Sequence, residues 1–278
     1  MNERALLYVP GDQPDKLSRA LERGADGIIV DLEDAVAEPA KDRARAAVAA
    51  WLAGRARGAA TIWVRVNSGR RRDGDVRAVA VHPALTGIYV AKAESAAELT
   101  DLDGQLTQLG SAAAVVPLLE SASAVLNARS IAAAPRVRRL QVGEADLAAE
   151  LGLHPGPDER ELWWVRSQVV LASAAAGVDA PIGPVSTDFR DLDQLRASSV
   201  ALRRFGFGGR ACIHPAQLPV VLDAFTPSAR EVQLAQDVVR RAEASDDGAT
   251  VGADGRMIDA AVIRQARRTL AYADDADE

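Results

Sequence analysis

Short apolar runs alternate with longer amphipathic stretches over the first 224 residues of the chain. Each run is continuous, and the stretch after it carries apolar residues at three- and four-residue spacing, as in an amphipathic helix. The predicted strands are residues 5–9, 27–30, 61–66, 87–91, 113–119, 139–142, 180–185 and 210–213. Because continuous apolar runs indicate strands covered on both faces, this pattern predicts βα units around a parallel sheet.

The number of these units favours one architecture. Eight βα units within 224 residues are compact but sufficient for an α/β fold of the (β/α)8, or TIM barrel, type. A doubly wound open sheet is the alternative. It usually has fewer strands, and no glycine-rich G-x-G-x-x-G loop follows any early strand. We therefore expect a TIM-barrel catalytic domain over residues 1–224.

The pattern changes after residue 224. Thr226, Pro227 and Ser228 predict the start of an amphipathic helix that runs to about residue 244. Turn residues at 246–248 and 254–255 flank a short apolar segment and predict a small hairpin, and a last helix is expected over about 259–272. Residues 225–278 should thus form a C-terminal helical and hairpin extension that is too small to bury a core of its own.

Some apolar positions are expected to pack against the barrel. In the helix predicted over residues 162–176, Trp163, Val170 and Ala174 lie in one stripe, and the spacing places Trp51 and Trp164 on helix faces that should also pack on the strands. The single cysteine, Cys212, falls in the last apolar run and should be a packed core thiol.

Composition excludes several classes of protein. The 278 residues are 48% hydrophobic and 26% charged, with a mean hydropathy of −0.05, which excludes a disordered chain. A net charge of −6 offers no basic surface to nucleic acid or to an acidic membrane. No apolar run approaches the roughly 20 residues of a membrane helix. One cysteine excludes an internal disulfide and a cysteine-rich zinc site, and it fits a cytoplasmic protein.

Charged residues gather where the predicted strands end. In a βα barrel these ends form one rim, where the chemistry takes place. The residues concerned are Asp31, Glu33, Asp34, Arg65, Asn67, Lys92, Glu94, Glu120, Glu144, Asp146 and His214. So many charges on one rim would be electrostatically unfavourable without a ligand that balances them.

The acids have two interpretations. Each of Glu33, Asp34, Glu120 and Asp146 could cap, or lie in, the first turn of the helix that follows its strand. Alternatively they bind a ligand together with the basic residues of the rim. Acids and bases that meet on one rim suggest a divalent metal beside an anionic substrate, and oxygen ligands favour Mg²⁺ or Mn²⁺ over zinc.

The basic residues differ in how strongly they indicate a functional site. Arg65 and Lys92 lie inside or at the end of strands that should be buried, where an unpaired cation is rare. His214 lies at a strand end, where it lines or braces the site, whereas His82 and His154 fall in loops. The run at residues 70–72 is either a solvated patch or a contact for a phosphate.

Short motifs along nearly the whole chain resemble one known family. They lie at residues 7–11, 31–36, 41 with 45, 64–67, 91–95, 119–122, 143–147, 213–217 and 255–259. In this order they resemble the citrate lyase β-subunit-like proteins of the HpcH/HpaI aldolase group, within the phosphoenolpyruvate/pyruvate barrel superfamily. The resemblance implies the same TIM-barrel fold.

The resemblance also implies roles for particular residues. Glu120 and Asp146 would be the carboxylate ligands of Mg²⁺, with Mn²⁺ as an alternative, and Arg65 would bind the carboxylate of a 2-oxo acid. Further contacts to the oxo acid or to the coenzyme A part of the acyl-CoA substrate are expected from residues near the strand ends. These are Tyr8, Lys16, Arg19, Glu33, Asp34, Lys92, His214 and Pro215.

The resemblance also extends to the C-terminal segment, and the chain departs from the family at one position of the seventh strand. Asp259 matches a catalytic acid that the family places over the barrel of a neighbouring subunit, so residues 225–278 would be a lid and oligomerisation segment of a homotrimer or hexamer. Family members often have Asp in the seventh strand, where this chain has Gly183. That departure leaves the metal pair intact and bears on the choice of substrate.

The activity implied is Mg²⁺-dependent carbon–carbon cleavage of a 3-hydroxyacyl-CoA thioester. Citryl-, malyl- or citramalyl-CoA would give acetyl-CoA and oxaloacetate, glyoxylate or pyruvate. One alternative is a malate or citramalate synthase–thioesterase that acts on acetyl-CoA and an oxo acid. Others are a citrate lyase β subunit that acts on a carrier-protein thioester and a non-catalytic barrel module.

Overall fold

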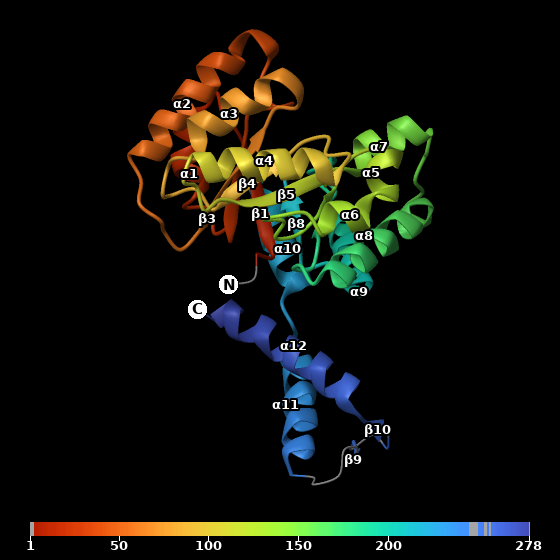
Figure 1. Ribbon diagram of the computed structural model, residues 1–278. Coiled ribbons are helices and arrows are strands. Elements are labelled where there is room, and N and C mark those ends of the chain that lie inside the picture. The colour runs from red at the N-terminus through yellow and green to blue at the C-terminus, as the bar shows by residue number, and fades with distance from the viewer. Residues whose placement is uncertain (1–2, 245–249, 253–254, 256, 278) are drawn as a thin grey trace. The chain divides into compact units, whose positions relative to one another are not determined.

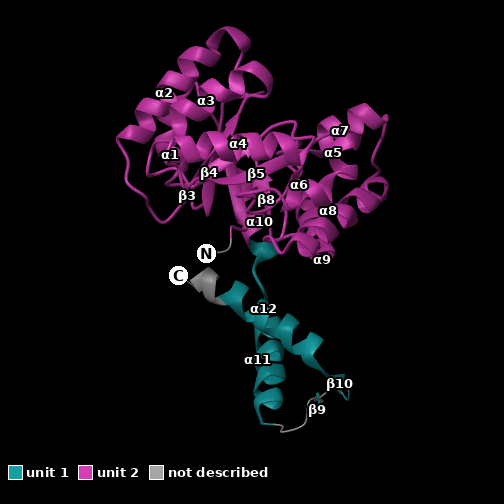
Figure 2. Cartoon of the chain, in the orientation of Figure 1, with its two compact units in different colours: residues 1–2, 223–278 teal, residues 3–222 magenta. Residues whose placement is uncertain are grey.

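The computed structural model describes residues 3–244, 250–252, 255 and 257–277. The chain divides into two compact units, one of residues 3–222 and a second that begins at Asp223 (Figure 2). The turn residues predicted at 246–248 and at Asp254 lie outside the described residues.

Within the described residues, eight parallel strands close into a barrel (Figure 1). They are β1 (Ala5–Pro10), β2 (Gly27–Asp31), β3 (Thr61–Val66), β4 (Gly87–Val90), β5 (Ala114–Leu119), β6 (Gln141–Val142), β7 (Ile182–Gly183) and β8 (Gly209–Cys212). Each strand pairs with the next, and β8 pairs with β1 through Arg210 opposite Ala5. The predicted TIM barrel and its strand positions are confirmed, although β6 and β7 are shorter than expected.

The barrel interior is filled by large apolar side chains. Trp63 and Tyr89 are fully buried, and their rings meet edge to face with centroids 5.5 Å apart. Leu6, Ile29 and Val116 pack into the same cluster. Because helices cover the outer face of the barrel and these side chains fill its interior, both faces of each strand are buried, and the strands appear in the sequence as continuous apolar runs.

Helices follow the strands and surround the barrel (Figure 1). They are α1 (Pro14–Ala20), α2 (Lys41–Ala53), α3 (Arg72–Val79), α4 (Ala96–Gln108), α5 (Ala122–Leu126), α6 (Ala128–Ala132), α7 (Glu144–Leu151), α8 (Trp163–Ala176), α9 (Leu192–Phe205) and α10 (Leu218–Phe225). Side-chain oxygens satisfy free amides at several helix starts: Ser95 caps α4, Ser121 caps α5 and Asp191 caps α9.

The face of α8 that turns inward differs from the prediction. Trp163 and Trp164 are 48% and 59% exposed, whereas Arg166 is buried in the inward face. Apolar residues occur on most sides of this helix, so their spacing could not select one face. Trp51 also lies outside the barrel wall, half-buried, with its indole N–H donating to the Ser18 hydroxyl at 3.2 Å. The expected packing of these tryptophans on the strands is therefore wrong.

The second unit contains α11 (Ala229–Glu243), the antiparallel hairpin of β9 (Thr250–Val251) and β10 (Met257–Ile258), and α12 (Ala260–Asp277). Ser228 caps α11 as expected, since its hydroxyl accepts from the Glu231 amide. Helices α11 and α12 pack against each other, with Ala235 and Ala266 buried. Among the residues that the structure describes, no helix combines the length and apolar composition needed to cross a membrane.

Candidate active site

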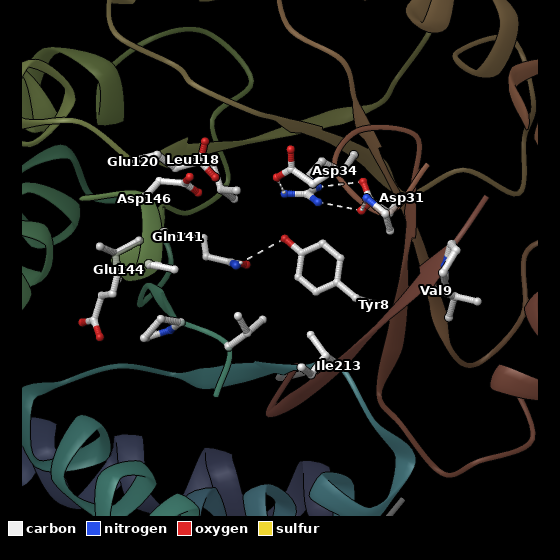
Figure 3. A pocket seen from close by; sticks show the side chains of 18 residues that line it. Tyr8, Val9, Asp31, Asp34, Leu118, Glu120, Gln141, Glu144, Asp146 and Ile213 are labelled. Atoms are coloured by element: carbon white, nitrogen blue, oxygen red, sulfur yellow. Dashed lines mark hydrogen bonds and ion pairs between the residues drawn. The ribbon is translucent and has the colours of Figure 1, made fainter. Parts of the chain in front are cut away.

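A cavity of about 400 Å³ lies at the carboxyl ends of the barrel strands (Figure 3). We call it the acid cavity, because carboxylates from several strand ends line it. Its charged and polar lining residues are Tyr8, Asp31, Asp34, Arg65, Glu120, Gln141, Glu144 and Asp146. Parallel strands of a barrel all end on one rim, which is why residues far apart in the sequence meet here.

Arg65 is 9% exposed and is held by the segment after β2. Its Nε and Nη2 donate to the two oxygens of Asp31 at 2.7 and 2.6 Å, and its Nη1 lies 3.0 Å from Glu33 and 3.3 Å from Asp34. The β2–β3 register pairs Asp31 with Arg65, which explains this contact. Burial disfavours the charged guanidinium, but the hydrogen bonds to Asp31 outweigh it and hold the pKa of Arg65 above its usual value. Glu33 and Asp34 therefore bind this arginine instead of capping a helix.

Lys92 contacts two of the acids by different atoms. Its half-exposed side chain places Nζ 3.0 Å from Glu33, and its backbone amide donates to Glu120 Oε2 at 3.1 Å. The backbone of Lys92 has φ +54°, a left-handed conformation that is uncommon outside glycine. Lys92 does not line the acid cavity itself. Its contacts position Glu33 and Glu120.

Glu120 and Asp146 line one side of the acid cavity (Figure 3). Glu120 follows β5 and is 6% exposed, and Asp146 lies in the first turn of α7. Burial, the charge of Glu33 and the charge of Asp146 raise the pKa of Glu120 to about 7, although Arg65 opposes the shift. A Cβ atom on Gly143 would lie 2.4 Å from Glu120 Cγ, so only glycine at 143 leaves room for this side chain.

The carboxylate pair fits a magnesium ion. The charges of Glu120 and Asp146 repel each other, and a divalent cation between them would remove that repulsion. Carboxylate oxygens are the ligands that Mg²⁺ prefers, and it commonly takes one or two of them from a protein. The described part of the chain holds no cluster of three or more His, Cys, Asp or Glu side chains suited to a metal. Water and substrate would have to complete the coordination.

Arg166 fixes the start of the helix that carries Asp146. It is completely buried, donates to both oxygens of Glu144 at 2.7 and 2.8 Å, and lies 2.8 Å from Glu159. This bidentate pair ties the first turn of α7 to α8. Arg166 is not among the residues predicted from the sequence, although a lone arginine within an apolar helix could have indicated it.

Tyr8 and Gln141 form a neutral polar pair in the acid cavity (Figure 3). Gln141 Nε2 donates to the Tyr8 hydroxyl at 3.4 Å, and the Arg65 guanidinium lies 5.1 Å from the centre of the Tyr8 ring. Gln141 is 2% exposed, and its Oε1 has no hydrogen-bond partner in the structure. Burial raises the pKa of Tyr8 well above its usual value, so the phenol stays neutral. Gln141 lies inside a strand and is not among the residues predicted from the sequence.

A second cavity, of about 340 Å³, adjoins the first. We call it the basic groove, because Lys16, Arg19 and Arg23 of the α1 region line it with His214 and Pro215. It shares Tyr8, Val9, Pro10 and Ile213 with the acid cavity. The structure thus brings together the predicted residues Tyr8, Lys16, Arg19, His214 and Pro215, and it adds Arg23.

His214 has a local contact as well. Its Nδ1 accepts from the Ala216 amide at 3.1 Å, and its ring stacks on Phe189 at 4.9 Å. It therefore braces the turn after β8 while it lines the basic groove. Asp259 belongs to the second unit, where its Oδ1 accepts from the Ala261 and Val262 amides at 2.9 Å each. Its place over a neighbouring barrel stays a prediction.

Other predicted positions lie away from both cavities. A Cβ atom on Gly183 would meet Leu202 Cδ1 of α9 at 2.8 Å, so residue 183 faces the helix layer. The link between this departure and substrate choice stays a prediction. Arg71 pairs with Glu38, so its side chain belongs to a surface ion pair. Cys212 is a buried core thiol as predicted, and burial raises its pKa to about 12.

Comparison with known proteins gives consistent matches. The model of the HpcH/HpaI aldolase/citrate lyase family matches residues 4–215. A (3S)-malyl-CoA thioesterase of Cereibacter sphaeroides is 36% identical over 98% of this chain and 94% of its own. A citrate lyase subunit beta of Leuconostoc mesenteroides is 30% identical over 97% and 93%. A crystal structure of CitE from Mycobacterium tuberculosis with magnesium, acetoacetate and coenzyme A matches with a TM-score of 0.82 and 30% identity, over 98% of each chain.

Proposed function

The chain belongs to the HpcH/HpaI aldolase/citrate lyase family, and we propose that it cleaves a carbon–carbon bond of a 3-hydroxyacyl-CoA thioester. The products are acetyl-CoA and a 2-oxo acid. The bond between the carbinol carbon and the carbon next to the thioester breaks, the hydroxyl proton leaves, and the acetyl-CoA carbon gains a proton. The reaction needs a site for two anionic ends with neutral atoms between them.

The adjoining cavities are the observation that supports this function. The acid cavity offers Arg65 to the carboxylate of the oxo acid, and the basic groove offers Lys16, Arg19 and Arg23 to the phosphates of coenzyme A. The wall that they share contains the apolar side chains of Val9 and Ile213. A hydroxyacyl-CoA has the same order of anion, neutral thioester and anion.

Arg65 orients the acid. Asp31 fixes the guanidinium through two hydrogen bonds, so its plane keeps one direction. The Nη1 atom meets only Glu33 and Asp34, at 3.0 and 3.3 Å, among the described residues. In our proposal this atom binds the substrate carboxylate in a charge-assisted pair.

Glu120 and Asp146 would hold Mg²⁺, and Mn²⁺ could use the same oxygen donors. When bound, the ion supplies Lewis-acid stabilisation of negative charge on the substrate oxygen. Lys92 and Gly143 keep Glu120 in place for this task, and Arg166 does so for the helix that carries Asp146. Asp259 of a neighbouring chain would exchange the proton at the thioester methyl carbon.

Replacing either carboxylate by its amide tests the proposal. Glu120→Gln or Asp146→Asn should abolish Mg²⁺-dependent cleavage of malyl- and citramalyl-CoA, followed by chromatography of the thioesters, and should weaken Mg²⁺ binding in calorimetry. Asp101→Asn, on an exposed position of α4, is the matched control and should behave like the parent protein. Full activity of either cavity variant would contradict the metal assignment.

A synthase–thioesterase is the second candidate, because a relative at 36% identity is a (3S)-malyl-CoA thioesterase. The same residues would then join acetyl-CoA to the oxo acid and release free coenzyme A. The two reactions differ in their products, since cleavage yields acetyl-CoA whereas hydrolysis yields free thiol. Activity only with a carrier-protein thioester would instead favour a citrate lyase β subunit, and absence of Mg²⁺ binding would favour a non-catalytic module.

A further inference from the structure

The acid cavity holds few positive charges for its many acids. Arg65 is the only cationic side chain among the described residues that line it. Asp31 accepts from Nε and Nη2 of that guanidinium, and Glu33 and Asp34 contact its Nη1. Glu144 is paired with Arg166 of α8. This one guanidinium, already in contact with three carboxylates, is therefore the cation that the cavity offers to a substrate carboxylate.

The remaining acids do not favour a second anion. Glu120 and Asp146 line the same cavity, and among the described residues no salt bridge joins either to a cation. The charge of one divalent ion would balance the two negative charges of this pair, which leaves no positive charge for a further carboxylate. A second carboxylate on the oxo acid would lose its hydration without a second cation to pair with.

Gln141 is a neutral polar side chain in the lining of the acid cavity. It lies between Tyr8 and the Glu120–Asp146 side of the acid cavity (Figure 3). Its side chain is 2% exposed, donates to the Tyr8 hydroxyl and leaves Oε1 without a partner. Leu118 and Val185 provide apolar surface in the same cavity. These neutral surroundings favour an oxo acid whose substituent is a hydrogen atom or a methyl group over one whose substituent carries a second carboxylate.

We infer that the oxo acid of this enzyme is monocarboxylic, of the glyoxylate or pyruvate class, with its uncharged substituent facing Gln141 and Tyr8. The inference rests on the proposed function, because it names the acid that the proposed site binds. It makes Gln141 a specificity-determining residue. A dicarboxylic acid of the oxaloacetate class is the substrate that the cavity disfavours.

The first experiment needs no variant. Calorimetric titration with Mg²⁺ present should show glyoxylate or pyruvate binding at least about tenfold more tightly than oxaloacetate. Because oxaloacetate decarboxylates to pyruvate, pyruvate in the cell is assayed enzymatically after each run. Equal or tighter binding of intact oxaloacetate overturns the inference and leaves the proposed function standing. No binding of any acid contradicts the proposed function itself.

The second experiment adds the missing cation. Gln141→Lys should shift the ratio of affinities towards oxaloacetate by about tenfold or more, because the ammonium can pair with the second carboxylate. Gln108→Lys adds the same charge at an exposed position of α4 and should leave the ratio unchanged. Gln141→Leu should keep the preference for monocarboxylic acids. An unchanged ratio in a folded Gln141→Lys protein, shown by circular dichroism, contradicts the role of Gln141.

Discussion

At the scale of single residues, the charged groups of the acid cavity are held by neighbours from other strand ends. Asp31 at the end of β2 orients Arg65 of β3, and the amide of Lys92 after β4 orients Glu120 after β5. Such cross-strand support fixes side chains before a ligand arrives, which lowers the entropy lost on binding. Disrupting these residues should therefore change ligand affinity or the free energy of unfolding.

Arg65 is predicted to serve both binding and stability. Arg65→Met should weaken binding of the oxo acid by about tenfold or more, because the charge-assisted pair is lost. It should also lower the free energy of unfolding by about 3–5 kcal/mol, since buried Asp31 would lose its partner. Arg65→Lys keeps the charge and should show a smaller loss of both. Calorimetry and urea unfolding measure the effects, and unchanged acid affinity in Arg65→Met would argue against the binding role.

Glu120 should make the metal-free protein less stable as pH rises. Its pKa is about 7 in the fold against 4.5 for a free side chain, so the folded protein keeps a proton that the unfolded chain releases. The free energy of unfolding should therefore fall between about pH 4.5 and pH 7 and stay low above that range. Urea unfolding in EDTA, compared with Glu120→Gln, isolates this contribution. A difference between the two proteins that does not change with pH would contradict it.

At the scale of elements, the sequence predicts strands better than helix faces. Continuous apolar runs such as Ala114–Leu119 mark a strand wherever both faces are covered. Helix α8 has apolar residues all round, and its inward face is decided by the ion pairs of Arg166 with Glu144 and Glu159, which lie in other elements. Such tertiary contacts leave no periodic pattern in the sequence.

The same difference explains which site residues the sequence could predict. Arg65, Glu120 and Asp146 lie in or just after strands, where the barrel rule directs attention to charged residues. Gln141 is a neutral residue inside a strand, so a search for charged residues at strand ends does not find it. Its importance depends on an unsatisfied amide oxygen inside a cavity, which requires three-dimensional coordinates.

Gly143, between β6 and α7, lies against the Glu120 side chain, and replacing it tests how closely the two must fit. Gly143→Ala places a Cβ 2.4 Å from Glu120 Cγ, so Glu120 must move and Mg²⁺ affinity should fall by about tenfold or more. Gly104→Ala is the matched control, because nothing lies within 4 Å of that Cβ in helix α4. It should stabilise the protein by about 0.5–1 kcal/mol and leave Mg²⁺ affinity unchanged. Parent-like Mg²⁺ affinity in Gly143→Ala would show that Glu120 tolerates the methyl group.

At the scale of the whole molecule, the second unit has little core of its own. Among its described residues beyond Ala224 and Phe225, Pro227, Ala235, Ile258 and Ala266 are the buried apolar side chains. So small a core gives little independent stability. We therefore propose that this unit packs on another chain in a homotrimer or hexamer, with Asp259 presented to that chain's acid cavity.

Subunit mixing tests the shared site. Asp259→Ala and Glu120→Ala should each be inactive alone, and mixed oligomers should regain part of the activity, because some sites then combine an intact Asp259 with an intact Glu120. Activity is measured after dissociation and reassociation, with mixed oligomers verified by mass spectrometry of differently tagged chains. Verified mixed oligomers without regained activity would argue that Asp259 does not act in a neighbour's cavity.

The burial of Cys212 has a practical consequence for such assays. With a pKa of about 12 and no exposed surface, the only thiol of the chain is neutral and shielded from reagents while the protein is folded. A colorimetric disulfide reagent added to the reaction therefore reports coenzyme A thiol without background from the enzyme. The same reagent reports unfolding once a denaturant exposes Cys212, so one dye can follow both hydrolysis and loss of structure.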